Sequence, residues 1–221
     1  MRWIAGFQWA ALPTNFPNWK TVYHYFWMRR RDKTWQRIQD TLRAWVRQKA
    51  GRHKHPTAGC VDSQSVKTTA IGGEARGYDP GKKVKGRNRH VLVDTLGLLL
   101  VVVVTSVSVQ DRDGARLLFR QLTGACKKLR CIWVDGGYRG TLLERVADRF
   151  QFAFRVVLRS DDQKEFKLLP RRWVVERTFG WLNYNRRLSK DYEVLPETAE
   201  TLVYLAMTRL MLRRLASPLT Q

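Results

Sequence analysis

The sequence predicts an α/β fold in which helices flank a mixed β-sheet and a small helical region comes first. Residues 1–50 have the apolar spacing of helices and contain no convincing strand. From residue 58 onward, short apolar runs bounded by turn residues indicate strands, which later alternate with helical patterns. The most apolar run, residues 98–104, is too short to cross a bilayer and fits a buried strand.

Two helices are expected in the N-terminal region. Thr21 is expected to cap the first, over residues 22–31, and the second covers residues 34–50 after a charged break. A basic linker with a proline, residues 51–59, follows. We therefore divide the chain into a helical region, 1–55, and a larger α/β domain, 56–216. Aromatic residues at helical spacing in the first helix are expected to be core: Trp19, Tyr23, Phe26 and Trp27.

The α/β domain is predicted to begin with three strands and to continue with alternating helices and strands. A strand at residues 58–65 is followed by a hairpin of 89–94 with 98–109. Then come a helix at 113–126, a strand at 130–135, a helix at 141–150, a strand at 152–159 and two helices from about residue 171 onward. An antiparallel start extended by parallel strands, with helices on both faces, is the order of the ribonuclease-H-like fold.

The charge of the chain indicates a polyanionic partner. Lys and Arg number 41 against 19 Asp and Glu, so the formal net charge is +22. Such an excess repels itself unless a polyanion neutralises it, and nucleic acid is the commonest one. Ribosomal and membrane-surface proteins share this property, so charge alone leaves DNA and RNA open. A hydrophobic content of 44% argues against a disordered basic tail.

The cysteines and the N-terminus favour a soluble, cytoplasmic protein that associates with the nucleoid when bound to DNA. Cys60, Cys126 and Cys131 are odd in number and form no CxxC pair, so they are expected to be reduced core thiols. The N-terminus lacks the pattern of a signal peptide.

Two aspartates follow apolar strand patterns in this very basic chain. Asp62 comes after Ala-Gly-Cys-Val, and Asp135 comes after Cys-Ile-Trp-Val and precedes two glycines. If these strands are adjacent and parallel, both carboxylates emerge at the same edge of the sheet. Taken singly, each aspartate is more simply a turn or helix-capping residue, whereas the two together favour a site.

Glu176 is the third candidate acid. A helix here would have Glu176 at the border of a packing face made by Val175, Phe179, Trp181 and Leu182. The alternative is an exposed pair between Arg172 and Glu176. Converging carboxylates need cations to neutralise them, and two Mg²⁺ ions about 4 Å apart can activate a water or a 3′-hydroxyl beside a phosphodiester.

Other polar residues are given structural interpretations. Asp94 is expected in a hairpin turn, Asp111 and Asp113 as helix caps, and His90 on a strand surface. His24, His53 and His55 belong to no Cys₂His₂ pattern. The basic loop before the hairpin is instead expected to bind the DNA backbone through Lys82, Lys83, Lys85, Arg87 and Arg89.

Four segments closely resemble transposases of bacterial insertion sequences, in the insertion-sequence-five family. They read CVDSQSVKTT, GYDPGKKVKGRNRHVLVDTLGLLLVVVVTSVSVQDRDGA, WVDGGYRG and RRWVVERTFGWLNYNRRLSKDYE, and the likeness extends from about residue 8 to residue 215. It implies that Asp62, Asp135 and Glu176 form a DDE catalytic triad that holds two Mg²⁺ ions, with Mn²⁺ as a substitute.

The resemblance also implies a set of DNA contacts. Tyr138 and Gly140 would lie beside the active site, whereas Leu169 and Asn183 depart from residues that many relatives carry near the glutamate. The residues expected to contact DNA are Lys67, Lys82, Lys83, Lys85, Arg87, Arg89, Tyr138, Arg139, Arg172 and Arg177. The expected partner is double-stranded DNA, both terminal inverted repeats and target, bound by a homodimer or higher oligomer.

The N-terminal helical region resembles part of a helix-turn-helix-like domain that reads terminal inverted repeats, and the chain is expected to lack part of that domain. The implied activity is cleavage of insertion-sequence ends and joining of their 3′-hydroxyls to target DNA. Two alternatives stay open: a truncated, non-catalytic DNA-binding inhibitor of transposition, and a nuclease of the same fold.

Overall fold

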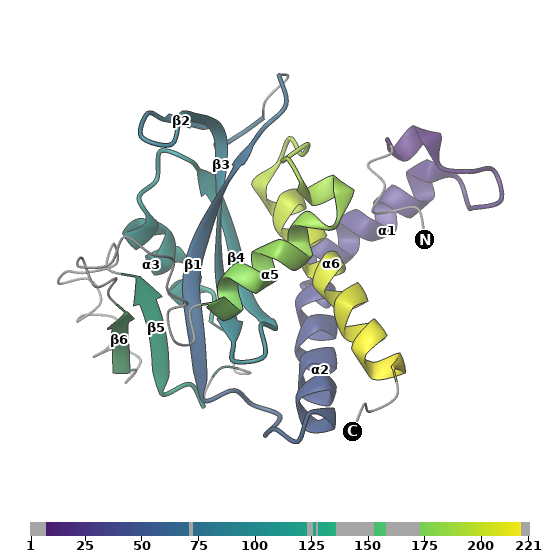
Figure 1. The fold of residues 1–221 in the computed structure, drawn as a ribbon. Coiled ribbons are helices and arrows are strands. Elements are labelled where there is room, and N and C mark those ends of the chain that lie inside the picture. The colour runs from purple at the N-terminus through teal and green to yellow at the C-terminus, as the bar shows by residue number, and fades with distance from the viewer. Residues whose placement is uncertain are drawn as a thin grey trace.

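The computed structural model describes residues 8–70, 73–122, 126, 128–135, 153–157 and 173–217. Its elements, in chain order, are η2 (Trp9–Ala11), α1 (Trp19–Arg31), α2 (Thr34–Lys49), β1 (Ala58–Lys67), β2 (Gly77–Asp79), β3 (Val84–Asp94), β4 (Leu99–Ser106), α3 (Asp111–Arg120), β5 (Cys131–Asp135), β6 (Ala153–Val157), α5 (Trp173–Asn183), η5 (Arg186–Leu188) and α6 (Pro196–Ala216) (Figure 1). The helix expected at residues 141–150 lies outside the described residues.

The strands form one mixed sheet. Its order is β2-β3-β1-β5-β6, and β4 also pairs with β3. The pairs of β3 with β1, β2 and β4 are antiparallel, whereas β5 pairs in parallel with both β1 and β6. The expected hairpin is the β3–β4 pair, whose turn contains Gly97 at a φ of 78°.

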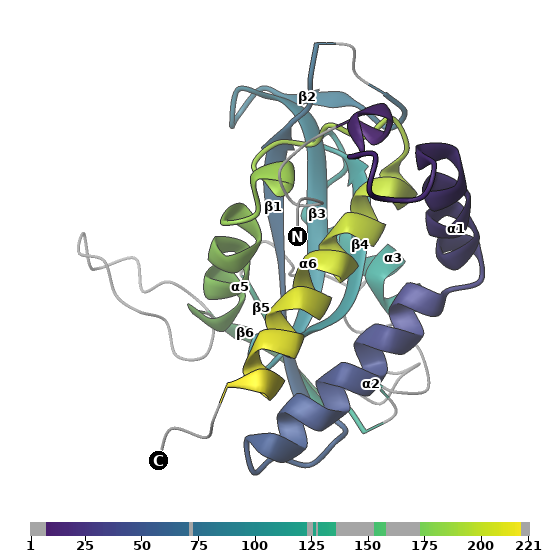
Figure 2. The same ribbon diagram turned by 90° about the vertical axis from the view of Figure 1, so that its right-hand side faces the viewer.

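Helices cover both faces of this sheet. Figures 1 and 2 show α5, α6 and α2 on one side and α3 on the other. The α5 and α6 face buries one apolar cluster that includes Cys60, Trp133 and Phe179, and the α3 face buries a second that includes Val61 and Phe119. The predicted class, a ribonuclease-H-like mixed sheet flanked by helices, is confirmed. Cys60 and Cys126 are buried thiols outside any disulfide, as expected, and Cys131 is half-buried.

The N-terminal helices form as predicted, but their details differ. The Asn18 side chain accepts a hydrogen bond from the Lys20 N–H at 3.0 Å, so α1 begins before Thr21 and Thr21 is not its cap. Of the four aromatic residues expected in the core, Phe26 is buried and Trp27 is half-buried, whereas Trp19 and Tyr23 are 37% and 38% exposed, so the prediction is wrong for these two. The division of the chain at residue 55 stays a prediction.

Three polar residues differ from their expected roles. The α3 helix begins after Gln110, so Asp111 and Asp113 lie in its first turn and do not cap it. His90 is buried, not on a strand surface, because α3 packs directly over it where Gly114 has no Cβ. Its Nε2 lies 2.9 Å from Thr105 Oγ1, and burial lowers the pKa of His90 to about 4, so its ring is neutral near pH 7. Asp94 does occupy the hairpin turn, where its carboxylate accepts the N–H groups of Leu96 and Leu98.

Side chains from α2 and α6 cover the backbone of β4, which lies at an edge of the described sheet. Gln39 Nε2 and Arg43 Nη1 donate to the Leu99 carbonyl at 3.3 and 3.0 Å. On α6, Glu200 Oε1 accepts the Val104 N–H at 2.9 Å. An uncovered edge strand can pair with another chain, so these contacts protect the sheet while they fix the two helices to it.

The Glu200 contact makes stability depend on pH. Burial raises the pKa of Glu200 from 4.5 to about 7, against the lowering effect of the Val104 N–H. Between these two values the folded protein binds more protons than the unfolded chain, so its stability falls as pH rises through that window.

We therefore expect Glu200→Gln, which keeps a carbonyl acceptor but cannot ionise, to stabilise the protein at pH 8. The expected gain in the free energy of unfolding is about 1–3 kcal/mol, and it disappears near pH 5. Urea unfolding at both pH values measures it. The control is Asp113→Asn on the exposed surface of α3, for which no such pH-dependent gain is expected. A gain of equal size at both pH values would contradict the ionisation of Glu200 as its cause.

Candidate active site

The parallel register of β1 and β5 places Asp62 and Asp135 in neighbouring positions. Cys60 pairs with Trp133, and each aspartate lies two residues further along its strand. Because side chains alternate along a strand, the aspartates point to the same face as Cys60 and Trp133, which is the face that α5 covers. Both are partly buried, and Asp62 Oδ1 accepts the Ser63 N–H at 2.8 Å.

Asp135 ends β5, as expected, but Asp62 does not end β1. The β1 strand continues to Lys67 beside β3, while its described pairing with β5 stops at Cys60. Asp62 therefore stands where β1 and β5 begin to separate, and a ligand can reach a carboxylate there without a break in the β1–β3 ladder.

Glu176 lies on the exposed side of α5, next to the row of residues that contains Asp62. Gln64, two residues after Asp62 on the same face of β1, donates to Asn183 Oδ1 at 3.2 Å. Asn183 is seven residues after Glu176, so the two share one side of the helix to within about 20°. At the other end of α5, Val174 and Cys60 line one pocket. The helix thus follows β1 past Asp62, and Glu176 belongs to that stretch.

The described residues do not form a closed metal site. Among them, no three His, Cys, Asp or Glu side chains lie close enough together to hold an ion. The donor chemistry nevertheless suits a hard divalent cation, because two neighbouring carboxylates repel each other unless a cation lies between them and carboxylate oxygens are the ligands that Mg²⁺ prefers.

The opposite face of β1 carries a separate polar contact. Ser63 Oγ donates to Asp111 Oδ1 at 2.5 Å. Side-chain alternation directs this contact to the α3 face, away from Asp62. Asp111 therefore anchors α3 to β1 and is not a member of the acidic pair.

The predicted basic loop separates into exposed and buried residues. Lys67, Lys82, Lys83 and Lys85 are exposed, as a DNA-binding surface requires. Arg87 and Arg89 are buried, so the prediction that they contact DNA is wrong for this structure.

The two buried arginines bind the connection between α5 and α6. Arg87 Nη1 lies 3.2 Å from Asp191 Oδ2 and donates to the Glu193 carbonyl at 2.8 Å. Arg89 Nη1 donates to the Leu188 carbonyl at 2.6 Å. Tyr138, Arg139, Gly140, Leu169 and Arg172, which the sequence also singled out, lie outside the described residues.

Sequence reasoning missed a pocket beside the acidic pair. Cys60, Trp133, Arg52, His55 and Trp173 are among the residues that line it, and its volume is 670 Å³. The basic composition of residues 51–55 was the available signal, but it was interpreted only as a linker.

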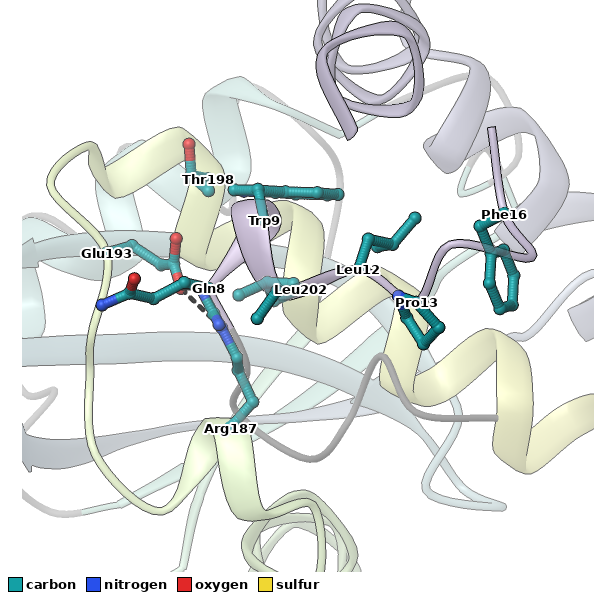
Figure 3. A pocket seen from close by; sticks show the side chains of 10 residues that line it. Gln8, Trp9, Leu12, Pro13, Phe16, Arg187, Glu193, Thr198 and Leu202 are labelled. Atoms are coloured by element: carbon teal, nitrogen blue, oxygen red, sulfur yellow. Dashed lines mark hydrogen bonds and ion pairs between the residues drawn. The ribbon is translucent and has the colours of Figure 1, made fainter. Parts of the chain in front are cut away.

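A second pocket lies between η2 and the start of α6. Figure 3 shows Trp9, Leu12 and Leu202 around it, with Arg187 and Glu193 joined at one end. Arg187 Nη2 lies 2.6 Å from Glu193 Oε1, so this Glu193 oxygen is already engaged. The pocket is small, at 110 Å³, and its carboxylate is paired, so it does not resemble a metal site.

Comparison with known families decides the class of protein. The family model described as "Transposase DDE domain" matches residues 53–211, well over half of the chain. The chain belongs to the transposase DDE domain family. No curated protein matches it. Membership indicates a transposase or nuclease class of enzyme that acts in DNA transposition and binds DNA. Within the described ranges, no helix of this transposase is both long and apolar enough to cross a membrane.

The burial of Arg87 predicts a large effect on stability. In Arg87→Ala, Asp191 would lose its ion-pair partner in the interior, so we expect the free energy of unfolding to fall by about 3–5 kcal/mol. The exposed Lys85→Ala in the same strand should change it by less than about 0.5 kcal/mol. Urea unfolding of both variants measures the difference, and similar losses in the two would contradict the structural role of Arg87.

Proposed function

We propose that this transposase cleaves insertion-sequence ends and joins their 3′-hydroxyls to target DNA, with Asp62, Asp135 and Glu176 as the ligands of two Mg²⁺ ions. The observation that carries the proposal is the pairing of β1 with β5, which gives Asp62 and Asp135 neighbouring positions on the face beneath α5. The motifs quoted above favour the insertion-sequence-five family within the wider one.

In this proposal the three carboxylates have one task, which is to fix the metal ions against the scissile phosphodiester. Divalent ions supply an activated water or 3′-hydroxyl and stabilise the leaving oxygen. Asp62 and Asp135 stand on a rigid sheet, so their separation changes little. Glu176 stands on a helix whose opposite side is buried, and its exposed position leaves room for it to turn toward the pair when ions and DNA bind.

The exposed lysines would supply the electrostatic attraction for duplex DNA. Lys82, Lys83 and Lys85 lie around the start of β3, and Lys67 ends β1 next to it. All four stand beyond Asp62 at the same end of β1. Phosphate contacts of this kind position a duplex but do not read its sequence. We further propose that two copies of the chain act together on paired ends, in the cytoplasm at the nucleoid.

A cleavage and strand-transfer assay with labelled element ends and Mg²⁺ tests the proposal. We expect Asp135→Asn to reduce cleavage at least about 100-fold, because an amide is a poor substitute for an anionic metal ligand, while DNA binding without metal is retained. The matched control is Asp113→Asn, an exposed acid of α3 with the same loss of charge, which should cleave normally. Glu176→Gln should behave like Asp135→Asn.

The possible outcomes separate the candidate functions. Cleavage without joining would indicate a nuclease of this fold, and DNA binding by an unmodified chain that never cuts would indicate a non-catalytic binding protein. Cleavage that survives Asp135→Asn would remove Asp135 from the site.

A further inference from the structure

A glycine in the middle of α5 is required neither by packing nor by backbone conformation. Gly180 lies inside Trp173–Asn183, where glycine costs about 1 kcal/mol relative to alanine. A Cβ built there would have no atom of the described residues within 4 Å, and its φ is not positive. The fold would therefore accept a side chain at this position, so the glycine leaves space that another molecule can occupy from outside the helix.

Gly180 is half-buried and lies on the outward side of α5, between the sides that carry Glu176 and Arg177; we call this strip of the helix its crest. At about 100° per residue, Glu176 is offset from Gly180 by roughly 40° in one direction and Arg177 by roughly 60° in the other. Tyr184, one turn further along, is 89% exposed. The crest thus has the candidate metal ligand Glu176 on one side and a cationic group on the other.

That cationic group consists of two arginines that share one indole ring. Arg177 stacks on Trp173 and Trp181, with its Cζ 4.3 and 4.6 Å from the two ring centres. Arg214, from α6, also lies over Trp181, at 4.5 Å. Stacking of this kind holds a guanidinium in place. Arg177 Nη2 also donates to the Leu96 carbonyl at 3.2 Å, which leaves Nη1 of Arg177 and the guanidinium of Arg214 as the donors for a ligand.

The two guanidinium groups repel each other, and the described part of the chain gives them no close counter-charge. Among the described residues, no carboxylate lies within salt-bridge distance of Arg177 or Arg214. Burial lowers the pKa of both groups, and the charge of Arg177 lowers that of Arg214 further. Their nearest acidic influence is Asp94, which is already paired with Arg47. An anion in contact with both groups would relieve this repulsion.

We propose that the crest of α5 is a docking track for the DNA sugar–phosphate backbone, in which Gly180 permits close approach while Arg177 and Arg214 together bind a phosphate. The inference rests on the proposed function, because it gives the crest a role in DNA positioning beside Glu176. Arg177 and Arg214 are then positioning residues. A phosphate held on one side of the crest fixes where the chain of phosphodiesters passes the acidic residues on the other.

The track is tested by adding side chains of different length at Gly180. Gly180→Ala and Gly180→Gln should both raise the thermal midpoint, because each residue favours a helix more than glycine does. The methyl group of alanine is short, so binding of random-sequence duplex DNA in EDTA should change little. The glutamine side chain occupies the crest, and we expect it to weaken binding about tenfold. Equal affinity of the two variants would overturn the proposal.

The phosphate site is tested by the salt dependence of binding. Arg177→Gln and Arg214→Gln should each lower the slope of log Kd against log salt concentration by about one. Arg116→Gln, which removes the same charge from the exposed surface of α3, is the matched control and should lower it less. If the arginines serve only to join α5 to α6, their variants will lose thermal stability but match the control in slope, and the proposal fails.

The same measurements separate this inference from the proposed function. If the unmodified chain cuts DNA but Gly180→Gln binds and cuts as Gly180→Ala does, the track alone is wrong. If Gly180→Gln weakens binding but the unmodified chain never cuts, the track is supported and the proposed reaction is wrong. A chain that does not bind duplex DNA at all overturns both.

Discussion

A buried ion pair between Arg87 and Asp191 joins the elements that define this fold. Both side chains are fully buried, and moving two charges out of water costs several kcal/mol for each ion. That cost is offset by the Asp191 carboxylate and by the carbonyls of Glu193 and Val194, to which Arg87 donates. The backbone of Asp191 also pairs with the end of β1, since its N–H donates to the Lys67 carbonyl at 2.9 Å. One residue pair thus connects β3, β1 and the segment between α5 and α6.

This connection matters for the site because it fixes the end of α5. The hairpin holds the middle of the helix. Thr178 Oγ1 donates to the Gly97 carbonyl at 2.9 Å, and Arg177 Nη2 donates to the Leu96 carbonyl at 3.2 Å. The hairpin is itself held by the ion pair of Asp94 with Arg47 of α2. Glu176 therefore stands on a helix restrained at its middle and beyond its C-terminal end, and the freedom it needs to reach a metal ion is that of its side chain.

Those elements that depend on local pattern could be predicted from the sequence. The apolar run 98–104 with Gly97 before it indicates a hairpin, and the apolar runs before Asp62 and Asp135 indicate that each lies on a strand. The register that puts the two aspartates on one face is known only from the structure. The burial of Arg87 could not be predicted, because its partner Asp191 is distant in sequence and the neighbouring lysines give the same charge pattern. The prediction that His90 lies on a strand surface was wrong for a similar reason. The packing of α3 on β3 covers this polar stretch on its second face, and the local sequence does not indicate it.

The burial of charged groups also changes what the net charge of +22 can explain. Arg43, Arg47, Arg87 and Arg89 are buried, but so are the acids Asp94, Asp191 and Glu193. The charge that a distant DNA molecule experiences is therefore almost unchanged, and long-range attraction stays strong at low salt. The residues that contact the duplex must nevertheless be exposed, so they are only a part of the basic run from Lys82 to Arg89. Attraction and contact are thus separate properties of this chain: the first follows from composition, and the second depends on which cations the fold leaves outside.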